Sequence, residues 1–300
     1  MSKGAKVWLI VGISLVLVVC IFVGVMAMLN WDFSKLSTVK YETNNYNLTE
    51  DYQNLSIRTQ TANIEFIPSA DGTTSVVCYE AEKVKHTVAI VDGTLVIERN
   101  DTRKWFEYIG FDFHNPKITV YLPKGEYGEL DIKASTGHTK LSDGFTFESV
   151  SVKASTGNIR VTGISAGAIN LSVSTGDINI TGMTCSGDIR IKVSTGKTNL
   201  TNVQCKNLFS DGDTGSITLT NVLASEKFDI ERDTGYVKLN SCDAAELYIE
   251  TDTGDVTGTL LSEKVFIVET DTGRIDVPRT ITGGRCEIET NTGDVRIRIE

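Results

Sequence analysis

Short stretches of alternating hydrophobic and polar residues fill most of the chain after its first 40 residues. Ile169, Leu171 and Val173, for example, are separated by single polar residues, and the alternation resumes after Gly176 with Ile178. A period of two places every second side chain on the same side of an extended strand. The pattern therefore predicts short β-strands, each with one buried face.

The dipeptide Thr-Gly recurs at intervals of 19 or 20 residues, and the hydrophobic pattern recurs with it. The nine glycines concerned are Gly137, Gly157, Gly176, Gly196, Gly215, Gly235, Gly254, Gly273 and Gly293. Counted from each glycine, hydrophobic residues occupy three short faces, at −7 to −3, +2 to +4 and +7 to +9. Between the faces lie corners rich in Gly and Asn, which tolerate the positive φ of a sharp turn.

Three strands and three corners in one period predict an all-β fold, a single-stranded parallel β-solenoid with 19–20 residues in each coil. Corresponding residues would stack about 4.8 Å apart, and the general preference for right-handed crossovers favours a right-handed coil. An antiparallel sandwich is the alternative, but it does not require the same residue class at the same offset nine times. The last strand carries Arg296 and Arg298, charges that we expect to protect the end of the solenoid from edge pairing.

Residues 7–29 form an uncharged, hydrophobic run, long enough as a helix to span the roughly 30 Å hydrocarbon core of a bilayer. Lys3 and Lys6 precede it, so the positive-inside rule places residues 1–6 in the cytoplasm and the rest outside. A cleaved signal peptide is the alternative, but its hydrophobic region is usually shorter. We therefore expect an uncleaved transmembrane helix over 7–29, a linker over 30–40, an irregular N-terminal part of the solenoid over 41–129 and the regular solenoid over 130–300.

The amino-acid composition limits which ligands and which kinds of catalysis the sequence predicts. The 300 residues include 36 Thr, which favours strands, and the net charge of −10 argues against nucleic-acid binding. The three histidines are scattered, so neither histidine-based catalysis nor a zinc site is predicted. Cys185, Cys205 and Cys242 occupy inward positions, with Leu261 in the place of Cys242 one coil further on. We expect these cysteines to be buried free thiols.

Aspartate replaces serine before the Thr-Gly corner in the C-terminal half of the repeat. The carboxylates concerned are Asp213, Asp233, Asp252 and Asp271, with Asp211 close to the first. On a solenoid they would form a ladder with a spacing of about 4.8 Å. One hypothesis is a weakly bound calcium ion along this ladder, because calcium prefers oxygen ligands, and the other is a solvated row of turns. Asp-Thr-Gly is also the aspartic-protease signature, but a ladder does not supply the facing pair of carboxylates. No other cofactor is predicted.

Residues 103–114 hold a cluster of aromatic residues that interrupts the N-terminal part. The candidate interaction residues are Trp105, Phe106, Tyr108, Phe111 and Phe113. One interpretation is a loop that covers the open end of the solenoid core. The other is an exposed contact site for a partner or for the membrane, because contiguous apolar patches mark contact sites.

A single anchor is followed by a strand that ends in Val120-Tyr121-Leu122-Pro123, then by Leu130-Asp131-Ile132-Lys133-Ala134-Ser135-Thr136-Gly137 and its repeats. This succession resembles the bacterial putative-adhesin family of β-strand-repeat domains, long classed as of unknown function, over roughly residues 40–300. The resemblance implies a β-helical extracytoplasmic domain of the bacterial envelope, with suggested links to adhesion and envelope stress. It implies no catalytic residues.

We therefore predict a non-enzymatic extracytoplasmic module, anchored once in the cell membrane, that acts in adhesion, protein or glycan interaction, or envelope-stress regulation. Its expected partners are the membrane, through the N-terminal helix, and an envelope protein or glycan. A polysaccharide-active β-helix enzyme is one alternative, but the even coil spacing leaves no inserted loops from which to build a cleft. A passive structural spacer is the other. The sequence predicts no oligomeric state.

Overall fold

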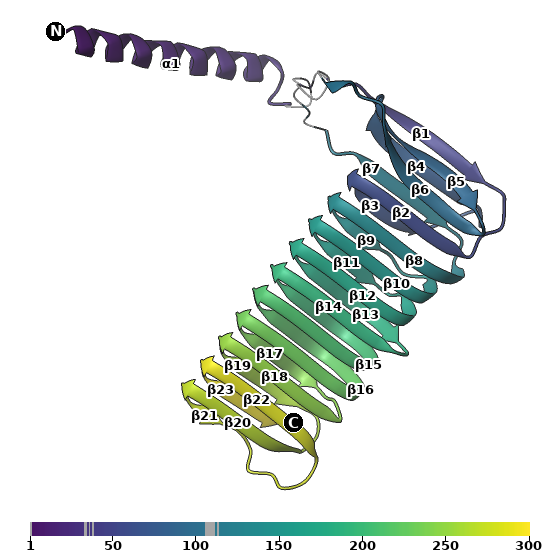
Figure 1. Ribbon diagram of the computed structural model, residues 1–300, viewed down its shortest axis with the longest axis vertical. Helices are drawn as coiled ribbons and strands as arrows, with labels where there is room; N and C mark the ends of the chain where they lie inside the picture. The colour runs from purple at the N-terminus through teal and green to yellow at the C-terminus, as the bar shows by residue number, and fades with distance from the viewer. Residues whose placement is uncertain (1, 33–34, 36, 38, 106–111, 113) are drawn as a thin grey trace.

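The computed structural model describes residues 2–32, 35, 37, 39–105, 112 and 114–300. Helix α1 (Lys3–Met28) opens the chain, and the side chain of Ser2 caps it by accepting a hydrogen bond from the backbone N–H of Ala5 at 3.2 Å. The helix is long and apolar enough to cross a membrane. An N-terminal helix of this kind fits a single-pass anchor or a signal sequence. In Figure 1 it stands at the N-terminal end of a long stack of strands.

The stack is a parallel β-solenoid, in which equivalent residues of successive coils lie on one another (Figure 1). Val152, for example, pairs with Ile132 on one side and Leu171 on the other, and all three are buried. The two-residue alternation of the sequence thus becomes rows of inward hydrophobic side chains. The predicted fold class, an all-β parallel solenoid behind one apolar helix, is confirmed.

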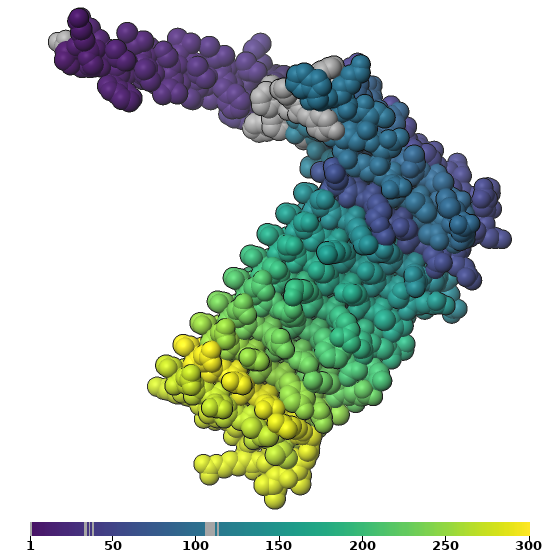
Figure 2. Space-filling view, in the orientation of Figure 1, coloured from purple at the N-terminus to yellow at the C-terminus, as the bar shows by residue number. Residues whose placement is uncertain are grey.

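The regular coils extend from β8 to β19. Their strands are β8 (Gly125–Thr136), β9 (Thr139–Leu141), β10 (Phe145–Thr156), β11 (Ile159–Thr162), β12 (Ser165–Thr175), β13 (Ile178–Cys185), β14 (Asp188–Thr195), β15 (Thr198–Thr214), β16 (Ile217–Thr234), β17 (Val237–Cys242), β18 (Glu246–Thr253) and β19 (Val256–Leu260). Figure 2 shows these coils as an unbroken wall. Interior side chains fill the solenoid along its whole length, so the coils form one continuous hydrophobic core.

Close stacking at the corners explains the repeated dipeptide. At Gly215 φ is +134°, and a Cβ added there would lie 1.8 Å from the carbonyl oxygen of Gly196 in the preceding coil. An L-residue neither adopts this φ readily nor fits the gap. Ala62 is tolerated at the equivalent corner between β2 (Asn54–Thr61) and β3 (Asn63–Pro68), because this first coil follows no Thr-Gly corner in the stack.

The C-terminal coils do not stack in chain order. β22 (Gly284–Thr292) pairs with both β18 and β20 (Lys264–Thr272), and β23 (Val295–Ile299) pairs with both β19 and β21 (Ile275–Asp276). The last coil of the chain is therefore inserted between the two coils that precede it in sequence. The prediction that the final strand ends the solenoid is wrong, because β20 and β21 end it instead.

One predicted core position also differs. The register between β17 and β19 shifts, so Leu260 rather than Leu261 pairs with Cys242. Leu260 is fully buried and Leu261 is 43% exposed, as expected when a slip of one residue turns a side chain to the opposite face. Cys185, Cys205 and Cys242 are buried free thiols, as predicted.

Further strands extend both walls of the solenoid at its N-terminal end. On one wall β6 (Thr94–Asp101) pairs in parallel with β2, and β5 (Val84–Val91) pairs antiparallel with β6. On the other, β7 (Lys117–Leu122) pairs in parallel with β3, and β4 (Thr74–Ala81) and then β1 (Tyr41–Leu48) follow antiparallel. A short hairpin joins β4 to β5. We call β1 and β4 to β7 the N-terminal cap, because their inward side chains close this end of the core.

Candidate functional site

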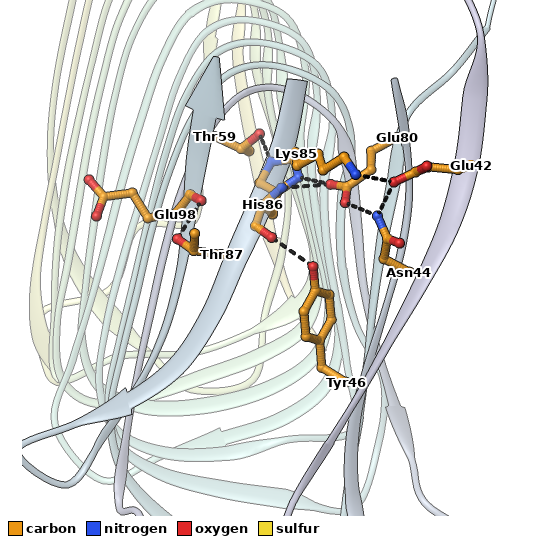
Figure 3. Close-up of polar contacts among 9 residues, drawn as sticks. All are labelled: Glu42, Asn44, Tyr46, Thr59, Glu80, Lys85, His86, Thr87 and Glu98. Carbon is orange, nitrogen blue, oxygen red and sulfur yellow. Dashed lines mark hydrogen bonds and ion pairs between the residues drawn. The ribbon is translucent and has the colours of Figure 1, made fainter. Parts of the chain in front are cut away.

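A pair of buried polar side chains lies inside the N-terminal cap (Figure 3). Glu80 on β4 is 1% exposed and His86 on β5 is 4% exposed. Oε2 of Glu80 accepts a hydrogen bond from the backbone N–H of His86 at 2.7 Å and lies 2.6 Å from Nδ1 of its ring. The hairpin between β4 and β5 brings the two residues together. Because a buried carboxylate needs hydrogen-bond donors, His86 is what makes burial of Glu80 tolerable.

Other side chains complete the hydrogen bonds of this pair. Nδ2 of Asn44 donates to Oε1 of Glu80 at 2.8 Å, and Oγ1 of Thr59 lies 2.9 Å from Nε2 of His86. The hydroxyl of Tyr46 donates to the carbonyl oxygen of His86 at 2.9 Å. Both carboxylate oxygens and both ring nitrogens therefore have partners, which fixes the orientation of the two side chains.

The network continues from the buried pair to the surface. Asn44 also donates to Glu42 at 2.8 Å, and Glu42 forms a 2.6 Å ion pair with Lys85 (Figure 3). The hydrogen bond from Lys85, supported by Asn44, lowers the pKa of the Glu42 carboxyl. A chain of polar contacts thus connects a solvated lysine with the buried carboxylate of Glu80.

A thiol lies beside the buried pair. Cys78 precedes Glu80 by two residues on β4, so both side chains point to the same side of the strand, and Cys78 is fully buried. Its Sγ, a carboxylate oxygen of Glu80 and a ring nitrogen of His86 all lie within 4.8 Å of one another. Burial, with the nearby charge of Glu80, raises the pKa of the Cys78 thiol to about 12. In the described part of the chain, no other three such side chains come as close.

A cavity of about 730 Å³ lies next to this network, and His86 forms part of its wall. Basic side chains line much of the rest, namely Lys40, Lys83, Arg99 and Arg103. Arg99 and Arg103 both pair with Asp101, at 2.5 and 2.7 Å. The hydrogen bonds from Arg103, together with the charge of Arg99, hold the pKa of Asp101 well below its usual range. Of the buried pair, His86 borders this cavity, whereas Glu80 is not among the residues that line it.

A second feature is an outward row of charged residues along the solenoid. It consists of the residue four positions before each corner. From the N-terminal to the C-terminal end of the stack the row is Arg58, Lys133, Lys153, Ser172, Lys192, Asp211, Glu231, Glu250, Glu289 and Glu269. Four of the first five are cations, and all of the last five are carboxylates. We call this row the charged face.

The sign of the charge changes at the middle of the row. Lys192 and Asp211, one of the predicted calcium ligands, meet there with 2.6 Å between Nζ and Oδ2. Within the acidic half, burial together with the charges of Glu289 and Glu231 raises the pKa of Glu250. Neighbouring carboxylates about 4.8 Å apart repel by about 1 kcal/mol in water. The acidic half therefore stores repulsion that a cationic partner would relieve.

The basic half has a shallow groove of about 560 Å³, lined by Arg58, Lys133 and Lys153 among others. Arg58 also pairs with Asp131 on the neighbouring coil. The centres of the two halves are five coils apart, about 24 Å at the usual strand spacing. This separation exceeds the Debye length of about 8 Å at physiological salt, so each half presents its own sign to a partner.

The other four aspartates predicted to bind calcium occupy the next row, two positions before the corner. Asp213, Asp233 and Asp252 lie exposed on three consecutive coils. The inserted coil places Asn291 between Asp252 and Asp271, and Nδ2 of Asn291 donates to Asp252 at 3.1 Å. The four aspartates therefore do not form one uninterrupted ladder. Calcium binding by the three adjacent ones stays a prediction.

Four of the predicted aromatic interaction residues lie outside the described residues, namely Phe106, Tyr108, Phe111 and Phe113. Trp105 is described and is 79% exposed. Near this segment the ring of Tyr41 stacks on that of His114, with centroids 4.3 Å apart, and the Tyr41 hydroxyl donates to Asp112 at 2.8 Å. These three residues line the cavity. A contact role for the aromatic segment stays a prediction.

Sequence reasoning missed both the buried cluster and the charged face. The spacing of Cys78 and Glu80 indicates two side chains on one side of a strand, but His86 joins them only through strand pairing outside the repeat. The change from basic to acidic residues was readable four positions before each corner. Its final order was not, because Glu289 precedes Glu269 in the stack only through the inserted coil.

These features place the chain among repeat proteins with a β-solenoid behind an N-terminal apolar helix. It belongs to the Toastrack DUF4097 family, whose model matches residues 52–208 and 183–300. The family resemblance predicted from the sequence is thereby confirmed. A comparison with curated proteins gives no match.

Several solved structures are similar to this chain. A putative adhesin from Bacteroides fragilis NCTC 9343 is 17% identical, over 86% of this chain and 97% of its own, with a TM-score of 0.49. A putative adhesin from Parabacteroides merdae ATCC 43184 is 13% identical, over 86% and 96%, with a TM-score of 0.51. A putative lipid binding protein from Parabacteroides distasonis ATCC 8503 is 14% identical, over 87% and 98%, with a TM-score of 0.32. At 13% identity the likeness to the Parabacteroides merdae structure concerns the fold alone.

Proposed function

We propose that the protein is a membrane-anchored, extracytoplasmic interaction module that acts in adhesion, and that the charged face is its binding surface. The observation that carries this proposal is the division of one outward row into a basic and an acidic half. A row whose charge were only for solubility would mix both signs along its length. Segregated charge is typical of surfaces that recognise a partner of complementary charge.

The regular wall supports a binding role rather than catalysis. Clefts in β-helix enzymes would come from loops inserted between coils, and the coils from β8 to β19 are joined by short corners. The cavity of about 730 Å³ lies in the N-terminal cap, and the grooves on the regular coils, of about 630 and 560 Å³, are shallow and open. A flat wall of stacked strands suits contact with another extended surface.

The charge order favours a second copy of this chain as the partner. Two copies placed face to face with their solenoids antiparallel are related by a two-fold axis parallel to the strands, between the coils of Lys192 and Asp211. Each half then faces the opposite half of the other copy. The facing positions are Lys192 with Asp211, Ser172 with Glu231, Lys153 with Glu250, Lys133 with Glu289, and Arg58 with Glu269. Ser172 alone offers no charge.

Symmetry repeats each facing pair, so the contact holds eight opposite-charge pairs. Exposed ion pairs contribute about 0.2–1 kcal/mol each, which gives roughly 2–8 kcal/mol before the cost of association. A single contact is therefore weak, and many copies on two surfaces would act together through avidity. Because the antiparallel arrangement puts the two N-terminal helices at opposite ends, it joins proteins from facing membranes. This geometry is that of adhesion between cells.

A photo-crosslinking residue placed at Lys153 in the full chain, on living cells, tests the proposal. The matched control carries the crosslinker at Lys238, which is exposed on β17 in a different row. Adducts with a second copy of the chain at position 153, but not at 238, are the expected result. Adducts with an envelope glycan or another protein would keep the interaction role and overturn self-recognition. Equal labelling from both positions would contradict binding through the charged face.

A further inference from the structure

We propose that Cys78, Glu80 and His86 form a binding site for a zinc ion in the N-terminal cap. Their Sγ, carboxylate and imidazole donor atoms lie within 4.8 Å of one another, and all three residues are at least 96% buried. Sulfur, nitrogen and oxygen together are a donor set that zinc accepts and that calcium does not. The site is separate from the charged face and does not depend on the proposed function.

Strand geometry brings the three side chains together. Cys78 and Glu80 share one face of β4 because they are two residues apart. The tight connection to β5 then returns the chain so that the backbone N–H of His86 itself donates to Glu80 at 2.7 Å. Both halves of the site therefore belong to one hairpin, whose two strands pair at Ala81 and Val84.

The surrounding hydrogen bonds are those of an outer shell around a metal site. Asn44 holds Oε1 of Glu80, which leaves Oε2 on the side of His86. Thr59 lies 2.9 Å from Nε2 of His86, so its hydroxyl can orient the ring while Nδ1 binds the ion. Such outer partners fix the tautomer and direction of a ligating histidine. The Sγ of Cys78, by contrast, takes part in no hydrogen bond within the described chain, although it is fully buried.

Zinc binding requires the Glu80 carboxylate and the His86 ring to move slightly apart, and it requires protons to leave the two ligand atoms that carry them. Bonds of about 2.0–2.3 Å in a tetrahedral site separate ligand atoms by roughly 3.2–3.7 Å, whereas Nδ1 of His86 and Oε2 of Glu80 are 2.6 Å apart. The imidazole changes tautomer: its proton leaves Nδ1 and is carried on Nε2, and this N–H donates a hydrogen bond to Oγ1 of Thr59. The thiol of Cys78 gives up its proton, which is released to solvent, and the thiolate binds the ion.

The protein supplies three ligands, so the fourth position of a tetrahedral site is open to water. The cavity of about 730 Å³ that His86 borders provides a path by which the ion and the water can reach it. Three protein ligands hold zinc less firmly than a closed four-ligand site, and we expect a reversible site that chelators can empty.

Titration with Co²⁺, whose bond to a thiolate absorbs light, tests the site on the full-length protein in detergent. We expect one Co²⁺ per chain with a thiolate charge-transfer band, displaced by one equivalent of Zn²⁺. Cys78→Ala should abolish the band. The matched control is Cys286→Ala, the same change at another fully buried strand cysteine, which should leave the band intact. A band that survives Cys78→Ala, or no band in the wild-type protein, would overturn the proposal.

A second measurement does not depend on the folding of a variant. X-ray absorption of the wild-type zinc complex should show one sulfur neighbour at about 2.3 Å and nitrogen or oxygen neighbours at about 2.0–2.1 Å. Several sulfur neighbours would place the metal on other cysteines and contradict the assignment. Thr59→Val, which keeps the size of the side chain, should weaken Zn²⁺ affinity about 10–100-fold in a chelator competition while the bound sulfur remains.

Discussion

Two glycine substitutions in the same solenoid separate the effect of positive φ from that of close stacking. Gly182 has a φ of +64°, and a Cβ added there would meet nothing within 4 Å. Gly215 has a φ of +134°, and a Cβ would lie 1.8 Å from the carbonyl oxygen of Gly196 and 2.6 Å from its carbon. Both residues are changed to alanine, one at a time.

The expected costs differ by a factor of three or more. An alanine with left-handed φ costs about 1–2 kcal/mol, and the lower entropy of the unfolded chain returns about 0.4–1 kcal/mol. Gly182→Ala should therefore lower the free energy of unfolding by about 1 kcal/mol. At Gly215 the backbone region itself costs about 1–3 kcal/mol, and the clash forces two coils apart. We expect Gly215→Ala to cost at least about 3 kcal/mol.

Urea unfolding of the full chain in detergent, followed by circular dichroism at a strand wavelength, measures the difference. A large loss for Gly215→Ala with a small one for Gly182→Ala is the predicted outcome. Equal losses would show that backbone conformation alone selects glycine at the corners. In that case the close approach of successive coils, the reason given for the nine Thr-Gly repeats, would be refuted.

Three further outcomes follow from buried and surface charge. Arg232 is 4% exposed and donates to the carbonyl oxygen and Oγ of Ser210 at 3.1 and 2.7 Å, and burial lowers its pKa to about 10. Arg232→Met should therefore leave the free energy of unfolding unchanged or raise it by about 1 kcal/mol in urea titrations; a loss above 2 kcal/mol would refute this. Folding raises the pKa of Glu250, so the folded state is favoured while this carboxyl is protonated. The free energy of unfolding therefore falls as the pH rises above the unfolded pKa of about 4.3. Glu250→Gln should increase the Tm at pH 7 but not at pH 3, and equal shifts at both values would contradict the stored repulsion. Raising the salt from about 0.15 M to 1 M, which shortens the Debye length from about 8 to 3 Å, should disperse cells joined through the charged face, whereas aggregates that persist would point to an apolar contact.

The sequence was sufficient for the fold because the solenoid repeats one local rule. The hydrophobic alternation and the corner glycine recur nine times, so each repeat supports the strands and corners assigned to the repeat before it. The order of coils was not predictable in the same way. Residues 284–292 match the repeat as well as residues 264–272 do, and only the path of the connection between them decides which strand is inserted.

The buried cluster shows a different limit of sequence reasoning. Cys78 and Glu80 lie two residues apart, but His86 reaches them across a hairpin in a region without the strict period. Three scattered histidines therefore predicted no metal chemistry, although one of them lies beside a thiol and a carboxylate. Site geometry that depends on pairing outside a repeat has to be read from the structure.

A charge-swap experiment on cells tests the central claim, that the charged face binds a second antiparallel copy. Lys153→Glu places two carboxylates opposite each other in the proposed contact, and Glu250→Lys places two lysines there. Each variant displayed alone should fail to aggregate cells, whereas a mixture of the two should aggregate like the wild type, because each Glu then faces a Lys. Lys238→Glu, the same charge change in another row, should aggregate normally. A mixture that stays dispersed while both variants remain folded on the surface would contradict the proposed contact.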